Sequence, residues 1–183
     1  MSSEMFGELV RRHGRADLVA FLQAFDHPML VQRRRADVPR RATPPPGAGG
    51  FSTRKIEEGS LGRAILGTLA PEADTPVIRV AKGGGGQFPG MVTVGRAPNM
   101  DIVLPHDSIS KFHAFFSRDG DGWVLTDAGS TNGTAVNEQR LEANAPVALR
   151  VGARVVFGHG QAWSFFPPRD FHALLAEAAR EIP

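Results

Sequence analysis

TVGRAPNMDIVLPHDSISKFHAFFSRDGDGWVLTDAGSTNGT, residues 93–134, is the most strongly patterned stretch of the chain. Three clusters of small polar and basic residues lie in it, each at the end of an apolar run. The clusters are Gly95-Arg96, Ser110-Lys111-Phe112-His113 and Ser130-Thr131-Asn132-Gly133-Thr134. Short apolar runs with polar turns between them are typical of β-strands joined by loops. The stretch therefore predicts a β-scaffold that presents its loops as a binding surface.

Apolar runs on both sides of this stretch extend the same pattern. The runs that predict strands are residues 77–80, 91–94, 101–104, 114–117, 123–126, 134–136, 146–149, 153–157 and 161–166. Between two of them, Asp119-Gly120-Asp121-Gly122 supplies residues that tolerate a positive φ, as a hairpin turn requires. The sequence therefore predicts a mainly-β fold.

The side chains of the three clusters indicate what the loops bind. Arg96 has a planar fork of donors suited to an oxyanion, and Lys111 offers a second positive charge. Ser110, Thr131 and Asn132 add neutral donors. None of these residues is a nucleophile with a base beside it. The set predicts an anion-binding site, most economically for a phosphate, and not an enzyme.

The GR, SxxH and STNGT motifs, in this order and with the DIVL run between the first two, resemble the forkhead-associated (FHA) domain. The resemblance covers residues 76–166, which is about half of the chain. It implies an FHA-like antiparallel β-sandwich that binds phosphothreonine peptides. With helical patterns at the N- and C-termini, the expected fold is this sandwich with short helical extensions at both ends.

The resemblance also implies a role for each matching residue. In the family, the arginine of the first motif and the first serine of the second contact the phosphate, and here these are Arg96 and Ser110. The threonine before Asn-Gly also reaches the phosphate, and the asparagine holds the peptide backbone; these are Thr131 and Asn132. Lys111 stands where the family often has arginine, so it keeps the charge but lacks the two-pronged donor geometry. These five residues form the expected phosphopeptide-binding site.

Three further residues are expected to shape the loops. Gly95 and Gly133 permit tight backbone paths where loops converge. By the resemblance, His113 braces the loops through hydrogen bonds instead of acting as a base toward Ser110. We therefore expect no catalytic residue in this region.

Other polar residues of the stretch suggest no further chemistry. Asp101, His106 and Asp107 lack the spacing of a metal site and are expected to be polar loop residues. Asp127 stands at a strand end with no catalytic role that can be assigned. The sequence therefore predicts neither a metal nor a cofactor.

The N-terminal residues have a helical pattern. Residues 4–25 place apolar side chains at three- and four-residue spacings, and Gly14 divides them into two short helices. Ser2 or Ser3 is the expected cap of the first helix. Residues 29–31 are either a short strand or a packed tail.

The C-terminal residues predict one more helix. Pro167-Pro168 ends the last strand, and Asp170 is the expected cap of an amphipathic helix whose apolar face packs on the sandwich or on the N-terminal helices. The predicted organisation is an N-terminal helical extension at 1–37, a linker with proline and glycine, partly ordered at most, at 38–75, the FHA-like sandwich at 76–167, and the C-terminal helix at 168–183.

Composition excludes several classes of protein. The chain has 183 residues and no cysteine, which rules out disulfides and thiolate metal sites. No apolar run approaches the ~18 residues of a membrane helix, and the first residues lack the pattern of a signal peptide, so we expect a cytoplasmic protein without a membrane partner. The pI of 9.6 overstates the basic character, because the formal net charge is only +2. Nucleic acid is therefore not an expected partner.

The predicted function is a phosphothreonine-peptide binding module that mediates phosphorylation-dependent protein–protein interaction in serine/threonine kinase signalling. The expected partners are a phosphothreonine-containing protein and a serine/threonine kinase or its substrates. Two alternatives stay open: a structural interaction adaptor that acts through the helical extensions, and a basic-tailed regulator associated with nucleic acid. The basic tail is the arginine-rich run at residues 33–41, which is otherwise a solvated linker.

Thr43 is a candidate phosphosite, because it follows Arg40 and Arg41 in a segment rich in proline and glycine. Some members of the family are phosphorylated on an N-terminal threonine that then occupies their own pocket. The sequence predicts that phosphorylated Thr43 can inhibit the pocket in the same way, and the alternative is an ordinary linker threonine.

Overall fold

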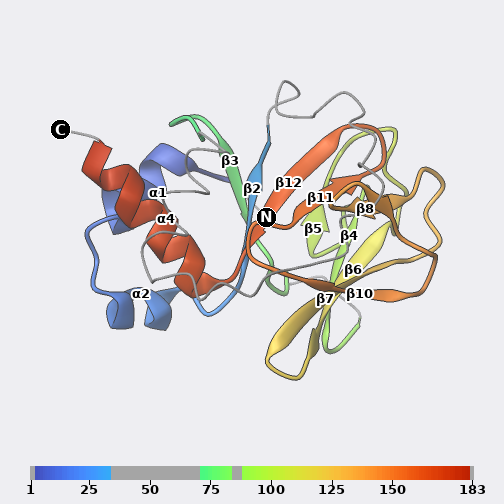
Figure 1. The fold of residues 1–183 in the computed structure, drawn as a ribbon. Coiled ribbons are helices and arrows are strands. Elements are labelled where there is room, and N and C mark those ends of the chain that lie inside the picture. Colours follow the sequence, from blue (N-terminus) through green and yellow to red (C-terminus); the bar gives the residue numbers. More distant parts are fainter. Residues whose placement is uncertain (1–2, 34–70, 84–87, 182–183) are drawn as a thin grey trace, which may run out of the picture.

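The structure, a computed structural model, describes residues 3–33, 71–83 and 88–181. Two β-sheets pack face to face, and helices cover the outer face of the larger sheet (Figure 1). This architecture confirms the mainly-β sandwich with helices at both ends that the sequence predicts.

The elements follow the predicted strands closely. The larger sheet has the order β1 (Glu4–Met5), β3 (Pro76–Arg79), β2 (Met29–Gln32), β12 (Gln161–Phe166), β11 (Arg154–Phe157), β8 (Thr134–Val136) and β9 (Gln139–Arg140). The smaller sheet has the order β10 (Pro146–Leu149), β7 (Gly122–Asp127), β6 (Ala114–Asp119), β4 (Met91–Gly95) and β5 (Ile102–Val103). The described helices are α1 (Phe6–His13), α2 (Leu18–Ala24) and α4 (Pro168–Glu181). Every predicted strand is present, and the expected hairpin turn joins β6 to β7.

One pair of strands departs from the expected antiparallel arrangement. β5 runs parallel to β4, with Ile102 beside Val94. The Asp101 carboxylate accepts hydrogen bonds from the N–H and the hydroxyl of Thr93, both at 2.8 Å, and these bonds return the chain to the side of β4. The loop of residues 96–101 is thereby fixed at the edge of the smaller sheet.

The molecule has two hydrophobic cores, one on each face of the larger sheet. The first lies between the two sheets and includes Val94, Phe116, Leu125, Phe157 and Phe165. The second lies between the helices and the larger sheet and includes Leu9, Phe21, Val31, Phe166 and Leu175. Neighbouring residues of β12 therefore serve different cores, as the alternation of side chains along a strand requires.

Residues 29–31, left as a strand or a packed tail by the sequence, form part of strand β2. This strand lies between β3 and β12 and is antiparallel to both. Leu30 joins the core between the sheets, whereas Met29 and Val31 join the core beneath the helices. The run is continuously apolar because both faces of the sheet are buried here. The N-terminal part of the chain thus supplies an interior strand as well as helices.

Two short helices lie on either side of Gly14, as predicted, but their caps differ from the expectation. The prediction that Ser2 or Ser3 caps α1 is wrong, because β1 precedes this helix and Met5 occupies its N-cap without a side-chain bond. In α2 the cap is Asp17, whose carboxylate accepts hydrogen bonds from the N–H groups of the first turn.

The C-terminal helix α4 begins at Pro168, so Asp170 lies within its first turn. The prediction that Asp170 caps this helix is therefore wrong. Proline suits the first helical position, since the N–H that it lacks would have no partner within the helix. Phe171 is buried in the second core, and His172 donates a hydrogen bond from Nε2 to the Ala16 carbonyl over 2.9 Å. The apolar face of α4 therefore packs on both expected supports, the N-terminal helices and β12.

Several predictions concern residues that the structure does not describe. Thr43, residues 34–41 of the arginine-rich run and most of the predicted linker lie outside the described ranges. The domain boundaries therefore stay predictions. Within residues 3–33, 71–83 and 88–181, no helix combines the length and the apolar character needed to cross a membrane.

Candidate functional site

The loops that carry the three polar clusters meet at one end of the sandwich. The Arg96 N–H donates to the Ser110 carbonyl over 2.9 Å, and the Ala128 N–H donates to the His113 carbonyl over 3.0 Å. The Thr131 N–H donates to the Ser110 hydroxyl oxygen over 3.1 Å. These bonds join the loop after β4, the loop before β6 and the loop after β7. The structure therefore brings together residues that lie far apart in the sequence.

Arg96 and Lys111 give this end of the molecule two available cations. Both side chains are exposed. The Arg96 guanidinium donates from Nε to the Ile109 carbonyl over 3.2 Å, and its two terminal nitrogens have no partner among the described residues. A Cβ on Gly95 would collide with the Lys111 carbonyl oxygen, so glycine lets the two loops touch at this point. The Lys111 ammonium likewise has no partner within the described part of the chain.

Neutral polar groups lie on the same loops. The hydroxyl oxygens of Ser110 and Thr131 are 3.4 Å apart. Asn132 donates from Nδ2 to the Ser108 carbonyl over 2.9 Å, which fixes the amide and leaves its side-chain oxygen without a donor among the described residues. The site therefore offers two hydroxyls and an amide oxygen beside the two cations.

His113 forms hydrogen bonds that join two of the loops. Its imidazole is fully buried, and Nδ1 accepts a hydrogen bond from the Ser110 N–H over 3.1 Å. Because an amide N–H can only donate, Nδ1 carries no proton, and Nε2 donates to the Gly133 carbonyl over 3.2 Å. Burial lowers the pKa of His113 below its ordinary 6.5, against the opposing effects of the Gly133 carbonyl and the Asp127 charge. Both nitrogens of a neutral ring are thus used for structure.

Asp127, to which the sequence assigned no role, organises the loop after β7. Its carboxylate accepts hydrogen bonds from the Gly129 and Ser130 N–H groups at 2.9 and 2.8 Å, and from the Ser130 and Thr134 hydroxyls at 2.7 and 2.6 Å. Burial would raise the pKa of Asp127, but the bonds from Thr134 and Ser130 outweigh it and hold the pKa below 3.8. An aspartate at the end of a strand, followed by a turn, can accept hydrogen bonds from the N–H groups two and three residues later, as in an Asx-turn. This pattern is the signal in the sequence that could have revealed the role of Asp127.

Ser108 is a second structural residue that the sequence did not reveal. Its hydroxyl oxygen accepts a hydrogen bond from the His159 N–H over 3.1 Å, and Nδ1 of His106 lies 2.8 Å from the same oxygen. Its carbonyl accepts the Asn132 amide bond described above. Ser108 therefore connects the loop before β6 to the loop after β7 and to the turn between β11 and β12.

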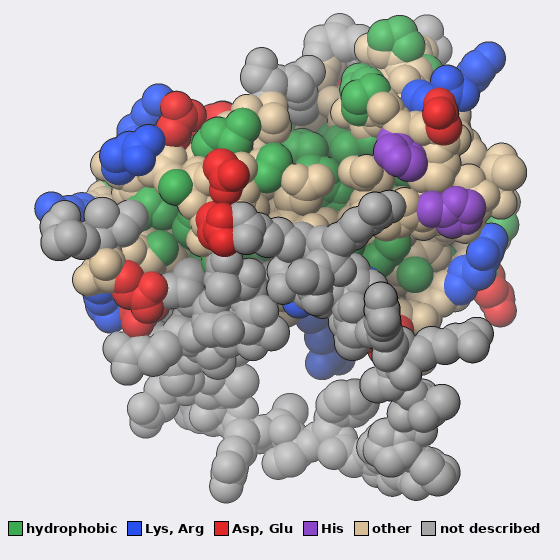
Figure 2. Space-filling model, turned by 90° about the horizontal axis from the view of Figure 1, so that it is seen from above, with side chains coloured by type: hydrophobic (Ala, Val, Ile, Leu, Met, Phe, Trp, Pro, Cys, Tyr) green, Lys and Arg blue, Asp and Glu red, His purple; other side chains and the backbone are tan. Residues whose placement is uncertain are grey.

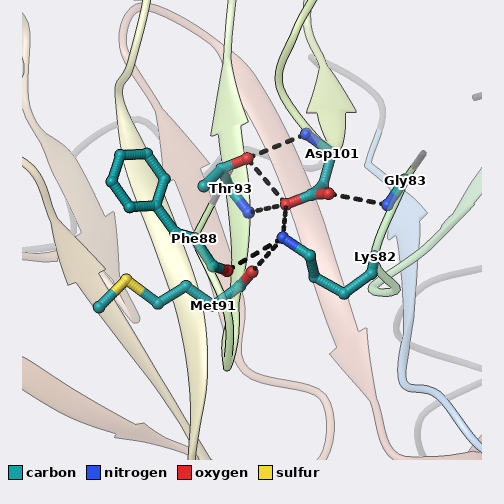
Figure 3. Close-up of polar contacts among 6 residues, drawn as sticks. All are labelled: Lys82, Gly83, Phe88, Met91, Thr93 and Asp101. Atoms are coloured by element: carbon teal, nitrogen blue, oxygen red, sulfur yellow. Dashed lines mark hydrogen bonds and ion pairs between the residues drawn. The ribbon is translucent and has the colours of Figure 1, made fainter. Parts of the chain in front are cut away.

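The base of the Arg96 loop is held by Asp101 (Figure 3). Asp101 is a polar residue of the loop before β5, as expected, but it is buried, with only 1% of its surface exposed. Besides its two bonds from Thr93, the carboxylate accepts bonds from the Gly83 N–H at 2.8 Å and the Lys82 ammonium at 3.0 Å. Burial would raise the pKa of Asp101, but hydrogen bonds from Thr93, Lys82 and Gly83 hold it below 3.8.

The donor set of the site suits an anion better than a cation. Figure 2 shows one face of the molecule, on which histidine side chains lie near both basic and acidic side chains at one end, with hydrophobic side chains toward the middle. Within the described ranges, no group of three or more His, Asp or Glu side chains is placed to hold a metal ion. The donors of Arg96, Lys111, Ser110 and Thr131 form an arrangement that can bind an oxyanion.

Comparison with known proteins finds a family model that matches the part of the chain that carries these loops. Residues 92–158 match the family model described as the FHA domain. The FHA domain-containing protein FhaB of Mycolicibacterium smegmatis is 39% identical over 67 residues, which are 37% of this chain and 42% of that protein. An ABC transporter ATP-binding/permease protein of Mycobacterium tuberculosis is 35% identical over 105 residues, which are 57% of this chain and 11% of that protein. The chain thus spans less than half of the length of these relatives.

Solved structures that align with part of this chain include FHA domains. One is the FHA domain of a protein from Chlamydia trachomatis, with a TM-score of 0.46 and 18% identity over 76% of this chain and 96% of that one. Another is the N-terminal FHA domain of Rad53p from S. cerevisiae in complex with a phosphothreonine peptide, with a TM-score of 0.43 and 24% identity over 53% of this chain and 88% of that one.

Proposed function

We propose that this chain, whose residues 92–158 form an FHA domain, binds phosphothreonine-containing proteins in serine/threonine kinase signalling. FHA domains are binding modules that read phosphorylated motifs. The observation that supports the proposal most is the link between the three loops: the Arg96 N–H donates to the Ser110 carbonyl, and the hydroxyls of Ser110 and Thr131 lie 3.4 Å apart. The terminal nitrogens of Arg96 have no partner among the described residues.

The proposed roles follow from the contacts. Arg96 binds the phosphate with its two terminal nitrogens, since Nε is already used. Ser110 and Thr131 donate their hydroxyls, and Lys111 adds a positive charge without a fixed geometry. Asn132 accepts a backbone N–H of the bound peptide with its free side-chain oxygen. His113 touches no ligand in this scheme and keeps the loops in place.

The energetics suit a reversible switch. A phosphate monoester carries a charge of about −1.5 to −2 at neutral pH. Each hydrogen bond to a charged group contributes roughly 1.5–3 kcal/mol, and association costs at least about 4 kcal/mol. Four such bonds at the upper end of this range therefore allow a net binding free energy of up to about −8 kcal/mol, which corresponds to a Kd of about 1 μM.

The partners proposed on this basis are a phosphothreonine-containing protein and a serine/threonine kinase or its substrates, in the cytoplasm. The adaptor alternative has less support, because α1, α2 and α4 bury their apolar faces against the larger sheet of the same chain. The basic-tail alternative concerns residues that lie largely outside the described ranges.

The experiment that tests this function is titration calorimetry with matched peptides. A phosphothreonine peptide library supplies a binding sequence, which is then made with unmodified threonine and with phosphoserine. We expect micromolar binding of the phosphothreonine form, weaker binding of the phosphoserine form and no binding of the unmodified form. Equal affinity for the modified and unmodified peptides would rule the proposal out.

A further inference from the structure

Arg140, which belongs to none of the motifs, lies against the loop of the proposed site. β8 and β9 form a tight hairpin in which Ala135 pairs with Arg140. The turn residues Asn137 and Glu138 have φ values of 48° and 71°, as a two-residue hairpin turn with positive φ requires. This turn fixes the position from which the Arg140 side chain extends.

The Arg140 guanidinium packs directly on the backbone of Gly133. A Cβ on Gly133 would lie 2.6 Å from Cζ and Nη2 of Arg140, so only the absence of a side chain allows this contact. The loop beneath is well fixed: the Gly133 N–H donates to the Ser130 hydroxyl oxygen over 2.9 Å, and its carbonyl accepts bonds from His113 and from the Gly158 N–H. The guanidinium therefore rests on a rigid support.

The charge of Arg140 has no partner among the described residues. The side chain is exposed, and its guanidinium has no hydrogen bond or ion pair with any described residue. The nearby hairpin residue Glu138 instead lies 3.9 Å from Arg154. A guanidinium has five donors arranged to hold a carboxylate by two bonds at once. An unpaired and positioned arginine of this kind is suited to bind an anionic group from another molecule.

We propose that Arg140 is a specificity-determining residue that binds an acidic side chain flanking the phosphothreonine of a bound peptide. This inference rests on the proposed function. Gly133 follows Thr131 by two residues, so the backbone on which Arg140 rests lies at most about 7 Å from the Cα of Thr131, whose hydroxyl belongs to the proposed site. An extended peptide rises about 3.3 Å per residue. The guanidinium is therefore within reach of a glutamate two or three positions from the phosphothreonine.

The test uses the whole chain and a set of phosphothreonine peptides in which one glutamate is moved stepwise along both flanks of a neutral sequence. Measurements at 0.15 M ionic strength limit general charge attraction to a range of about 8 Å. We expect wild type to prefer glutamate at one position by about fivefold, as for an exposed but well-oriented ion pair. Arg140→Gln abolishes this preference and leaves the affinity for the neutral peptide unchanged, and Arg140→Lys retains part of it.

The control is Arg150→Gln, which removes an exposed arginine next to Leu149, at the opposite end of strand β7 from the site. This variant is expected to bind both the glutamate-containing peptide and the neutral peptide with wild-type affinity. If wild type binds phosphothreonine peptides but shows no glutamate preference at any position, the inference about Arg140 is wrong and the proposed function stands. The inference is also wrong if Arg140→Gln keeps the preference or weakens both peptides equally. Failure of wild type to bind any phosphothreonine peptide would overturn the proposed function and this inference together.

Discussion

His113 donates a hydrogen bond from Nε2 to the carbonyl oxygen of Gly133 over 3.2 Å, and this bond joins the second polar loop to the third. The other ring nitrogen accepts the Ser110 N–H, so the imidazole spans the site from the phosphate-binding serine to the glycine that supports Arg140. The neutral His113 side chain thus fixes the distance between Ser110 and Gly133, two residues of the proposed ligand-binding loops.

The stability of the protein is expected to fall below pH 6.5, in part because of His113. Its pKa in the folded state is lowered by burial, so the unfolded chain binds the proton more tightly. The contribution is therefore complete above about pH 6.5 and is lost as the pH falls through the folded pKa. Urea unfolding at pH 7.5 and 5.5 measures this, and His113→Gln is expected to show a smaller difference between the two pH values. His159→Gln, at the exposed turn between β11 and β12, is the control and should leave the difference unchanged.

Arg96→Ala is expected to abolish phosphopeptide binding without loss of stability. The side chain is exposed and makes one bond to a backbone carbonyl, so its contribution to folding is small. Loss of two hydrogen bonds to a phosphate dianion, at roughly 1.5–3 kcal/mol each, weakens affinity by at least about a hundredfold and takes micromolar binding beyond detection. Calorimetry and thermal unfolding measure the two effects, with Arg150→Ala as the control. Wild-type affinity in the variant would mean that the phosphate binds elsewhere.

Phosphopeptide affinity is expected to weaken as the pH falls from 7 to 5. The second pKa of a phosphate monoester is about 6, so the dianion is replaced by the monoanion in this range. Calorimetry at several pH values measures the effect, and circular dichroism at each pH checks that the protein stays folded. A flat profile would show that the dianion is not the preferred ligand.

Asp101→Asn is expected to destabilise the fold by about 1–3 kcal/mol. The carboxylate accepts bonds from two backbone N–H groups, a hydroxyl and an ammonium, and a carboxamide would set its own N–H donors against some of them. The pKa of Asp101 is held below 3.8, so its contribution is present above that pH and is lost as the pH falls further. Urea unfolding at pH 7 measures the loss. Asp119→Asn, at the exposed hairpin, is the control, and equal stability of both variants would contradict this role.

Phosphorylation of Thr43 is expected to weaken binding of an external phosphopeptide. A ligand in the same chain acts at a high effective concentration, near millimolar for short tethers, and competes with free partners. The measurement is a titration of the phosphorylated chain beside Thr43→Ala with one peptide. Identical affinities would exclude self-inhibition and leave the proposed reader function intact.

The sequence allowed the strands around the binding loops to be predicted because each is short, apolar and bounded by turn residues. The loop residues followed from the motifs, and Arg96, Ser110 and Thr131 do lie on loops that touch. Burial of polar residues was harder to foresee. Asp101 and Asp127 look like ordinary loop carboxylates in sequence, and only the folded chain shows how many donors surround each.

The interior position of strand β2 and the contact of Arg140 with Gly133 could not be predicted from the sequence, for different reasons. A continuously apolar run such as residues 29–31 does not distinguish a strand buried on both faces from a packed tail. Its partners, β3 and β12, are also distant in sequence. Arg140 is one of many exposed arginines, and its relation to Gly133 depends on the geometry of a hairpin.

The interior position of β2 bears on how this protein can be divided. A fragment cut to the family match at residues 92–158 would lack β2, β3 and β12. A fragment that starts at residue 71 would lack β2, the strand that pairs with both β3 and β12. Two unpaired strand edges facing a gap are a template for any extended peptide. We expect such fragments to aggregate and to be rescued in trans by a synthetic peptide that contains residues 29–32. On this expectation, residues 29–32 belong to the smallest unit that folds by itself.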